Sequence, residues 1–304
     1  MVASLLHFPL LNCFTSHYMK HGFLLIDKPE GPTSHDAVAT VRNLLHERKI
    51  GHLGTLDPAA SGLLVLAVGA KALKVVEFFK DLSKEYIAEI AFGSVSTTYD
   101  REGVIEKYPP KAGWVPLDQV EVVNIIRDHF LGDIEQVPPE HSAIKIGGDR
   151  AYRKARQGRG VNMPARRVHI EDCGIISYDY PTLTLHVSCG SGTYIRSLAN
   201  DLGQRMRCGG YLAGLQRTKV GEWSLDFAVP PDAVEWSQVI PLKEVLIGFS
   251  SIELSAEEAE RVQHGQDIEQ EVKPDTIGWF DELPIAVLTP AKDGSQMAHA
   301  RKVL

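Results

Sequence analysis

The stretch that decides the fold is KIGHLGTLDPAASGLLVLAVGAK, residues 49–71, in which a glycine-rich loop leads into an apolar run. Residues 63–68 are apolar without alternation, a pattern typical of a strand that is covered on both faces. The loop before them contains one carboxylate, Asp57, and glycines at positions 51, 54 and 62, which allow other groups to approach the backbone closely. We therefore expect a buried strand and, directly before it, a tight loop that places Asp57 against the core.

Asp57 permits two interpretations. Because Pro58 follows it, DPAA is typical of a turn or of a short helix that Asp57 would cap, and most Asp-Pro pairs have such a structural role. The segment also lies between a basic helix end and an apolar strand, where a carboxylate is partly desolvated, close to cations and therefore reactive. His52 adds a polar ring to the same loop. The residues leave both interpretations open, but no P-loop, GxGxxG or GxSxG pattern supports a phosphate cradle or a hydrolase site.

The sequence on either side predicts further strands and helices. Residues 22–28 are typical of a short buried strand that ends in a Pro/Gly turn, and Ser34 is expected to cap the helix that follows. Residues 84–92 alternate, which places Tyr86 on the apolar face of a strand. In that position Tyr86 is either a core residue or a ring that lines a cleft.

The rest of the chain extends this pattern as far as residue 248. Residues 117–130 and 194–206 have helical periodicity, and residues 168–177 and 183–189 are typical of strands. The strands neither alternate regularly with helices nor cluster without them, so we predict an α+β domain.

The composition shifts near residue 250. A capping box formed by Ser255 and Glu258 begins a helix, and a strand-like tail punctuated by prolines follows to Leu304. We therefore predict a large domain over residues 19–248 and a small C-terminal module over residues 249–304. We expect residues 1–18 to be a disordered or non-native extension, because Met19 directly precedes the first convincing strand.

The composition excludes several classes of protein. The formal charge is −7, so any polyanion must bind a local basic patch rather than a global positive field. The four cysteines form no CxxC pair and the histidines have no paired ligand spacing, so we predict no metal. No apolar run is long enough to span a bilayer, and we expect a cytoplasmic protein with reduced thiols.

One local basic patch stands out between residues 145 and 167. It combines many cations with one acid, Asp149, and one aromatic residue, Tyr152, which fits a strip that follows a phosphate backbone. The alternative is a solvated helix face, which is what most charge runs are. The residues expected to contact backbone phosphates are Lys145, Arg150, Arg153, Lys154, Arg156, Arg166 and Arg167.

Arg196 lies in the first turn of a predicted helix, where a cation gains nothing from the helix dipole. Such an arginine is either exposed or paired with an anion, and Asp57 is the candidate partner. Leu215, further along the chain, would be taken for a plain core residue from its pattern alone.

Taken together, the motifs resemble those of the TruB family of tRNA pseudouridine synthases. The stretch GHLGTLDPAASGLL is similar to the family signature, which reads roughly GHxGTLDPxAxGxL. The other similar segments, in order, are GFLLIDKPEGPTSHD, KEYIAEIAFGSVSTTYDREG, QVPPEHSAIKIGGDRAYRKARQG, VSCGSGTYIRSLANDLG and LQRTKVGEW. The resemblance covers about residues 22–225 and is far more specific than any single motif.

The resemblance implies a fold, a reaction and a set of site residues. The fold would be that of pseudouridine synthases, with a central mixed, mainly antiparallel sheet flanked by helices and a small PUA-like C-terminal module. The reaction would convert uridine to pseudouridine at position 55, in the T-arm loop of tRNA, without cofactor or metal. The catalytic residues would be Asp57, Tyr86 and Arg196, and the substrate-binding residues Lys28, His52, Tyr194 and Leu215.

Two other functions remain open. An RNA-guided pseudouridine synthase would act inside a ribonucleoprotein, and a non-catalytic factor would bind or fold RNA on the same scaffold. The short C-terminal module argues against the first alternative, and the presence of all three catalytic candidates gives no reason to prefer the second. We expect a monomer that binds tRNA, without an obligate protein partner.

Overall fold

The computed structural model describes residues 21–140, 145–146, 149–150, 163–291 and 296–304. The expected extension at residues 1–18 therefore lies outside the described residues. The chain divides into two compact units. Of the described residues, the larger unit comprises those within 24–67 and 75–234, and the smaller unit those within 21–23, 68–74 and 235–304.

The larger unit is built on a mixed sheet in which β12 pairs with β3 in parallel and with β4 antiparallel. From β4 the sheet continues through antiparallel pairs to β11, β10 and β7. The strands, in spatial order, are β1 (Gly22–Lys28), β3 (Ala60–Val68), β12 (Gly210–Val220), β4 (Lys84–Phe92), β11 (Thr182–Cys189), β10 (Arg166–Asp179) and β7 (Gly132–Gln136). The expected mixed, mainly antiparallel sheet is confirmed. Short strands β2 (Ile50–His52) and β13 (Trp223–Ser224) pair with β3 and β12.

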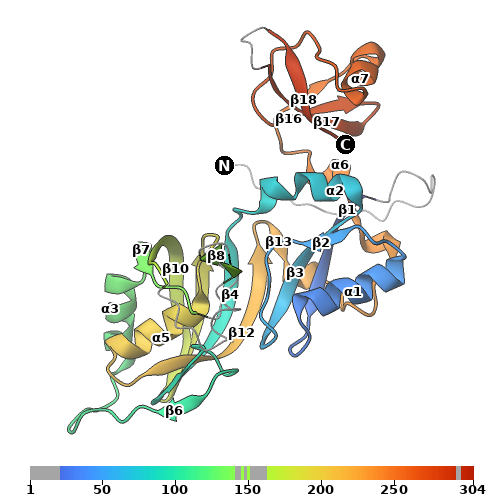
Figure 1. Ribbon diagram of the computed structural model, residues 1–304. Coiled ribbons are helices and arrows are strands. Elements are labelled where there is room, and N and C mark those ends of the chain that lie inside the picture. The colour runs from blue at the N-terminus through green and yellow to red at the C-terminus, as the bar shows by residue number, and fades with distance from the viewer. Residues whose placement is uncertain (1–20, 141–144, 147–148, 151–162, 292–295) are drawn as a thin grey trace. The chain divides into compact units, whose positions relative to one another are not determined.

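Three helices accompany this sheet: α1 (Ser34–Leu45), α3 (Gln119–His129) and α5 (Ile195–Arg205). α1 packs beside β2, α3 contacts β10, and α5 lies against β12 (Figure 1). Sequence reasoning was wrong about the cap of α1, because Thr33 rather than Ser34 occupies the N-cap and forms a capping box with Asp36. Ser34 is instead the first helical residue and is buried.

The core follows the predicted patterns. Every residue of β3 except Ser61 is buried, as expected for an apolar run without alternation. In β4 the buried positions alternate with more exposed ones, and Tyr86 lies on the buried face. α5 adds Ile195, Leu198 and Leu202 to the same hydrophobic cluster, which fixes the start of this helix against the sheet.

Two smaller hairpin-like pairs belong to the larger unit. β5 (Ser94–Ser96) pairs with β6 (Ile105–Lys107), and the loop between these strands contains Asp100. β8 (Lys145–Ile146) pairs with β9 (Asp149–Arg150). Both pairs are antiparallel.

The smaller unit contains a four-stranded sheet with one helix packed on it. The sheet has the order β15 (Ser251–Glu253), β16 (Thr276–Phe280), β17 (Leu283–Pro290) and β18 (Ala298–Val303). The helix α7 (Ala256–Gln263) contacts β16, β17 and β18 and begins with the predicted capping box of Ser255 and Glu258. This sheet is consistent with a PUA-like module. The compact unit already begins at Glu235, and the domain boundary at residue 249 stays a prediction.

The smaller unit is completed by three short elements: α2 (Ala70–Val75), α6 (Leu242–Val245) and β14 (Ile240–Pro241). Residues 22 and 23 pair with β14. Across the described part of the chain, no helix combines the length and the apolar character that crossing a membrane would require.

Candidate active site

Asp57 lies in the loop between β2 and β3, and the residues after it form a turn rather than a helix. The backbone N–H of Ala60 donates to the Asp57 carbonyl at 3.0 Å, and β3 begins at Ala60. The interpretation of Asp57 as a helix cap is therefore wrong, and its carboxylate is available for another partner. Glycines at both ends of the loop adopt positive φ angles, +89° at Gly54 and +97° at Gly62. At Gly62 an added Cβ would come within 2.3 Å of the Arg217 carbonyl oxygen, so the loop enters β3 only without a side chain there.

The Asp57 loop is held from the β1–α1 side by Ser34. The Ser34 hydroxyl donates to the Leu56 carbonyl and accepts from the Leu56 N–H, both at 2.9 Å. The neighbouring Gly31 N–H donates to the Pro58 carbonyl at 2.8 Å. Ser34 is only 1 % exposed and Leu56 is buried, so water does not reach the Leu56 backbone. The bonds to Ser34 satisfy its N–H and carbonyl instead.

Two arginines hold the same loop from other strands and loops. Arg101 donates to the Ala59 carbonyl at 3.2 Å, and it also pairs with Glu30. Arg217 of β12 donates to the Gly54 carbonyl at 3.2 Å. The backbone on both sides of Asp57 is therefore fixed before any ligand binds, as a preorganised site requires.

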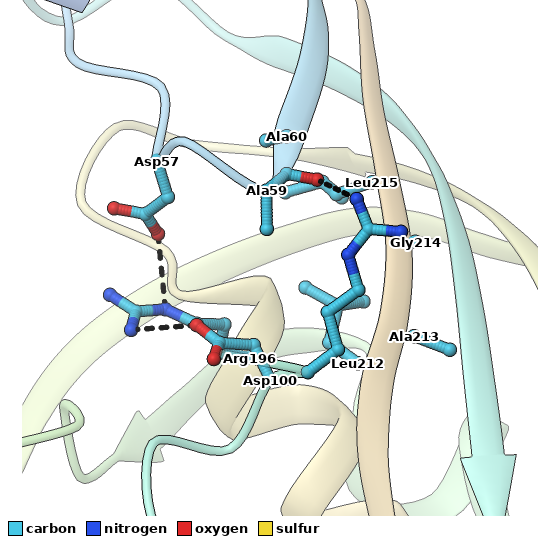
Figure 2. A pocket seen from close by; sticks show the side chains of 10 residues that line it. Asp57, Ala59, Ala60, Asp100, Arg196, Leu212, Ala213, Gly214 and Leu215 are labelled. Carbon is cyan, nitrogen blue, oxygen red and sulfur yellow. Dashed lines mark hydrogen bonds and ion pairs between the residues drawn. The ribbon is translucent and has the colours of Figure 1, made fainter. Parts of the chain in front are cut away.

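The carboxylate of Asp57 pairs with Arg196, as the sequence predicts. Arg196 Nε lies 3.2 Å from Asp57 Oδ2, and Figure 2 shows the guanidinium directed at this carboxylate. The Arg196 side chain is 9 % exposed, whereas that of Asp57 is 43 % exposed. The arginine is thus part of the interior, and the carboxylate stands at the boundary with solvent.

A second carboxylate, Asp100, binds the same guanidinium and was missed by sequence reasoning. Asp100 Oδ2 lies 3.1 Å from Arg196 Nη1, and its side chain is only 5 % exposed. Asp100 also accepts hydrogen bonds from the Thr98 hydroxyl at 2.5 Å and from the Glu102 N–H at 3.0 Å. The only sequence signal was an acid in the polar loop SVSTTYDREG, which resembles an ordinary surface loop.

Six of the seven predicted catalytic and substrate-binding residues line one cavity of about 520 Å³. Its volume falls within the roughly 300–1,000 Å³ of small-molecule sites. The cavity is lined by His52, Asp57, Tyr86, Tyr194, Arg196 and Leu215, together with residues of the neighbouring loops. These residues come from β2 and the loop after it, β4, the start of α5 and β12, so the fold assembles the site from segments far apart in the sequence.

Tyr86 is both a core residue and a cavity residue, so its two interpretations are compatible. It is 9 % exposed, and burial raises the pKa of its hydroxyl. The nearby Arg217 guanidinium opposes that shift by charge and by a hydrogen bond to the Tyr86 side chain. Tyr86 therefore presents a neutral phenol ring to the cavity at neutral pH.

His52, the last residue of β2, lines the cavity with a neutral ring. Burial lowers the pKa of His52, and the nearby charges of His35 and Arg217 lower it further. Its ring packs edge-on against that of His35, with centroids 5.6 Å apart. Nδ1 of His52 is buried and has no hydrogen-bond partner among the described residues.

Tyr194 is fixed by a buried glutamine on β7. The Gln136 amide accepts from the Tyr194 N–H at 2.8 Å and donates to the Tyr194 carbonyl at 3.0 Å. Gln136 is 2 % exposed, so its amide takes the place of a strand partner for Tyr194. This contact anchors the residue directly before α5, and with it the position of Arg196.

Lys28 does not line the cavity. It is fully buried, and its Nζ donates to the carbonyls of Pro29 and Pro32 at 2.8 Å each. Burial lowers the pKa of Lys28, and the carboxylate of Asp57 opposes this shift. Its substrate contact stays a prediction, since the structure assigns the ammonium to its own turn.

The predicted RNA strip is only partly described. Arg153, Lys154 and Arg156 lie outside the described residues, and Lys145 and Arg150 are placed as backbone of β8 and β9. The two remaining members, Arg166 and Arg167, begin β10. Arg167 pairs with Asp133 at 2.8 Å and its side chain is 77 % exposed, so part of its charge is neutralised at the surface.

The described residues contain no group of three or more His, Cys, Asp or Glu side chains that could hold a metal ion. The side chains of the site are one accessible carboxylate oriented by a buried arginine, beside aromatic and aliphatic walls. Such a cavity can bind a planar ring and place a carboxylate at its edge.

The chain is similar in sequence to known proteins of one family. The sequence profile of the TruB family pseudouridylate synthase N-terminal domain matches residues 42–195. A protein named tRNA pseudouridine synthase B from Carboxydothermus hydrogenoformans is 39% identical over 262 residues, 84% of this chain and 88% of its own length. The protein of the same name from Thermobifida fusca is 41% identical over 274 residues, 86% of this chain and 91% of its own.

Solved structures show the same fold at low sequence identity. An H/ACA RNP bound to a substrate RNA containing 2'-deoxyuridine includes a chain with a TM-score of 0.66 and 20% identity, covering 94% of this chain and 86% of that one. A Cbf5-Nop10-Gar1 complex includes one with a TM-score of 0.65 and 21% identity, covering 94% and 85%.

Proposed function

The chain belongs to the TruB family of pseudouridylate synthases, and we propose that it isomerises uridine to pseudouridine at position 55, in the T-arm loop of tRNA. Its relatives at 39% and 41% identity are named tRNA pseudouridine synthase B. The observation that carries the assignment is the Asp57–Arg196 pair, 3.2 Å apart at the edge of a cavity of about 520 Å³.

The target base must leave its stack to enter this cavity. Extruding a nucleotide costs a few kcal/mol, which is offset by stacking and hydrogen bonds in the pocket. Tyr86 and Tyr194 supply aromatic surface for the base, and Leu215 supplies an apolar wall. His52, with its neutral ring at the cavity, is placed to displace the nucleotide from the RNA stack.

The reaction rearranges one bond without a net change in atoms. The N1–C1' bond of uridine breaks, the uracil rotates, and a C5–C1' bond forms. The proton on carbon 5 is removed, and a proton is delivered to N1. Asp57 would act on the sugar, either by adding to it covalently or by stabilising the developing positive charge.

Arg196 acts through Asp57 and also confines it. Its guanidinium is bound to two carboxylates and is nearly buried, so it holds the Asp57 oxygens at the edge of the cavity. Tyr86 would take the proton from carbon 5 only as a phenolate, which becomes a neutral phenol in that step, so its hydroxyl proton must leave first. Burial disfavours the phenolate, and the adjacent Arg217 guanidinium is the group that would stabilise it.

RNA outside the cavity would meet basic residues of β8, β9 and β10. We propose that Arg166 and Arg167, together with the basic residues between 145 and 156, contact phosphates of the T-arm. The PUA-like module is proposed as an additional RNA-binding part. A cytoplasmic location and a monomeric state remain predictions.

The test is to incubate the purified protein with an unmodified tRNA transcript and to map pseudouridine chemically at each position. Product confined to position 55 without any added component is the expected result. Activity that needs a guide RNA or added proteins would support the RNA-guided alternative. Binding without product would support a non-catalytic RNA-binding factor.

A further inference from the structure

The cavity carries more positive charge than its single lining carboxylate balances. Its lining includes Arg196, Arg217, Lys80 and Lys84, against one acid, Asp57. Arg196 is already shared by Asp57 and Asp100. The other cations therefore require an explanation of their own, especially in a protein whose formal charge is −7.

Lys84 is a buried lysine at the cavity wall. It is 9 % exposed and lies on β4 two positions before Tyr86, so the two side chains share one face of the strand. Its Nζ donates to the Leu82 carbonyl at 2.5 Å and to the Lys80 carbonyl at 3.4 Å. Burial lowers the pKa of Lys84, and repulsion by Arg217 lowers it further.

Arg217 is more deeply buried and adds to the positive field. It is 2 % exposed, and it donates to the Leu63 carbonyl at 2.7 Å, to the Gly54 carbonyl and to Tyr86. Among the residues that the structure describes, no carboxylate lies within ion-pair distance of Lys84 or Arg217. The carboxylate of Asp81 attracts Lys84 only from beyond that distance. Buried charges of one sign without an ion-pair partner are costly, and an anionic ligand would relieve that cost.

The loop beside Lys84 provides further groups for an anion. The Ser191 hydroxyl donates to the Lys80 carbonyl at 3.0 Å, so Ser191 and the Lys80–Lys84 turn lie side by side at the cavity. The Lys80 side chain is 68% exposed and only 3.9 Å from Asp81, a loose surface pair. The N-terminus of α5, at Ile195, also opens on the cavity and contributes its positive dipole end.

We propose that Lys84, with Lys80, forms a phosphate subsite that binds the phosphodiester on one side of the extruded uridine. This inference rests on the proposed function and adds a second contact point to the same cavity. A nucleotide that rotates out of the helix carries its flanking phosphates toward the pocket, and a cavity of about 520 Å³ has room for more than a planar base. The subsite would fix the sugar relative to Asp57, because it holds the backbone next to the reacting C1' atom.

The test is a double-mutant cycle that combines a substitution of Lys84 with a change to the RNA backbone. Dissociation constants are measured for a T-arm stem-loop, and for two stem-loops in which the phosphate 5' or 3' of the target uridine is a neutral methylphosphonate. One of the two substitutions is expected to weaken wild-type binding by roughly tenfold or more, the effect of losing a charge-assisted hydrogen bond. Lys84→Met should weaken binding of the natural stem-loop to a similar degree and be insensitive to that same methylphosphonate.

Lys219→Met is the matched control. Lys219 lies on the neighbouring strand and pairs with Glu85 at 3.2 Å instead of lining the cavity. This variant should keep the wild-type response to both methylphosphonates. If Lys84→Met does not fold, as judged by circular dichroism, the exposed Lys80→Met is used in the same cycle and is expected to show a smaller coupling of the same sign.

The subsite would be overturned if the protein and RNA changes had strictly additive effects on binding. In that case wild type and Lys84→Met would be equally sensitive to both methylphosphonates. Binding is measured separately from turnover, so a wild-type protein that binds the stem-loop with this coupling but makes no pseudouridine would contradict the proposed function and leave the subsite supported.

Discussion

Asp100 Oδ2 lies 3.1 Å from Nη1 of Arg196, so that the arginine which orients Asp57 is itself held by a second, buried carboxylate. The three groups form a chain from the interior to the cavity: Asp100 is nearly inaccessible, Arg196 is nearly buried, and Asp57 is partly exposed. This arrangement limits the motion of the accessible carboxylate without a covalent link. It also makes the geometry of the guanidinium, and not only its charge, important.

Arg196→Lys tests whether this geometry matters. An ammonium is a point charge that cannot present separate N–H groups to both carboxylates, so one of the two contacts should be lost. We expect single-turnover pseudouridine formation to fall by roughly a hundredfold while the dissociation constant for the stem-loop changes by less than about threefold. A rapid-quench assay with saturating enzyme measures the first quantity, and filter binding measures the second. Losing binding and rate in the same proportion would argue against the role assigned to Arg196.

Ser34→Ala tests whether the fixed backbone of the Asp57 loop supports the reaction. The substitution leaves the buried Leu56 N–H without its acceptor, which should cost about 1–3 kcal/mol of unfolding free energy. Because the loop then moves more freely, we expect kcat to fall by roughly tenfold with KM nearly unchanged.

Thr33→Ala is the matched control for Ser34→Ala. Thr33 is the N-cap of the same helix, and losing it should cost about 1 kcal/mol. Its hydroxyl does not contact the Asp57 loop, so kcat should stay at the wild-type value. If the two variants reduce kcat in proportion to their loss of stability, the Ser34 contact serves only the fold.

His52→Asn tests the neutral state of the histidine at the cavity. The pKa of His52 in the folded protein lies below its ordinary value of 6.5, so the unfolded chain binds the proton more readily. The stability of the wild type should therefore rise with pH between the lowered pKa and about 6.5, and be lost as the pH falls through that range. Thermal unfolding of both proteins at a series of pH values should show a shallower dependence for the variant. Identical slopes would mean that His52 titrates as it does in the unfolded chain.

Much of the fold follows from local patterns in the sequence. The apolar run became β3, buried along nearly its whole length, and the alternation around Tyr86 became β4. The pairing of Arg196 with Asp57 was one of two interpretations of a cation at a helix N-terminus, and the resemblance to the TruB family favoured it. These inferences succeed because each depends on a local residue spacing or on a single charge in an unfavourable position.

Other parts of the site depend on tertiary contacts that no local pattern contains. Asp100 stands in a polar loop, and its contact with Arg196 depends on α5, which supplies that arginine from a distant part of the sequence. Ser34 was expected to be a cap because Thr33 and Ser34 are both good N-cap residues, and their roles are decided by which hydroxyl faces the Asp57 loop.

The central claim is that the carboxylate of Asp57 carries out the isomerisation. Asp57→Asn keeps the size of the side chain and removes its charge, so the cavity and its other contacts are preserved. The most direct measurement is single-turnover conversion of uridine in an unmodified tRNA transcript, with the dissociation constant of the same variant measured in parallel. We predict binding within about threefold of wild type and no pseudouridine above the background of a reaction without enzyme. Conversion by Asp57→Asn at a rate within about tenfold of wild type would contradict the account.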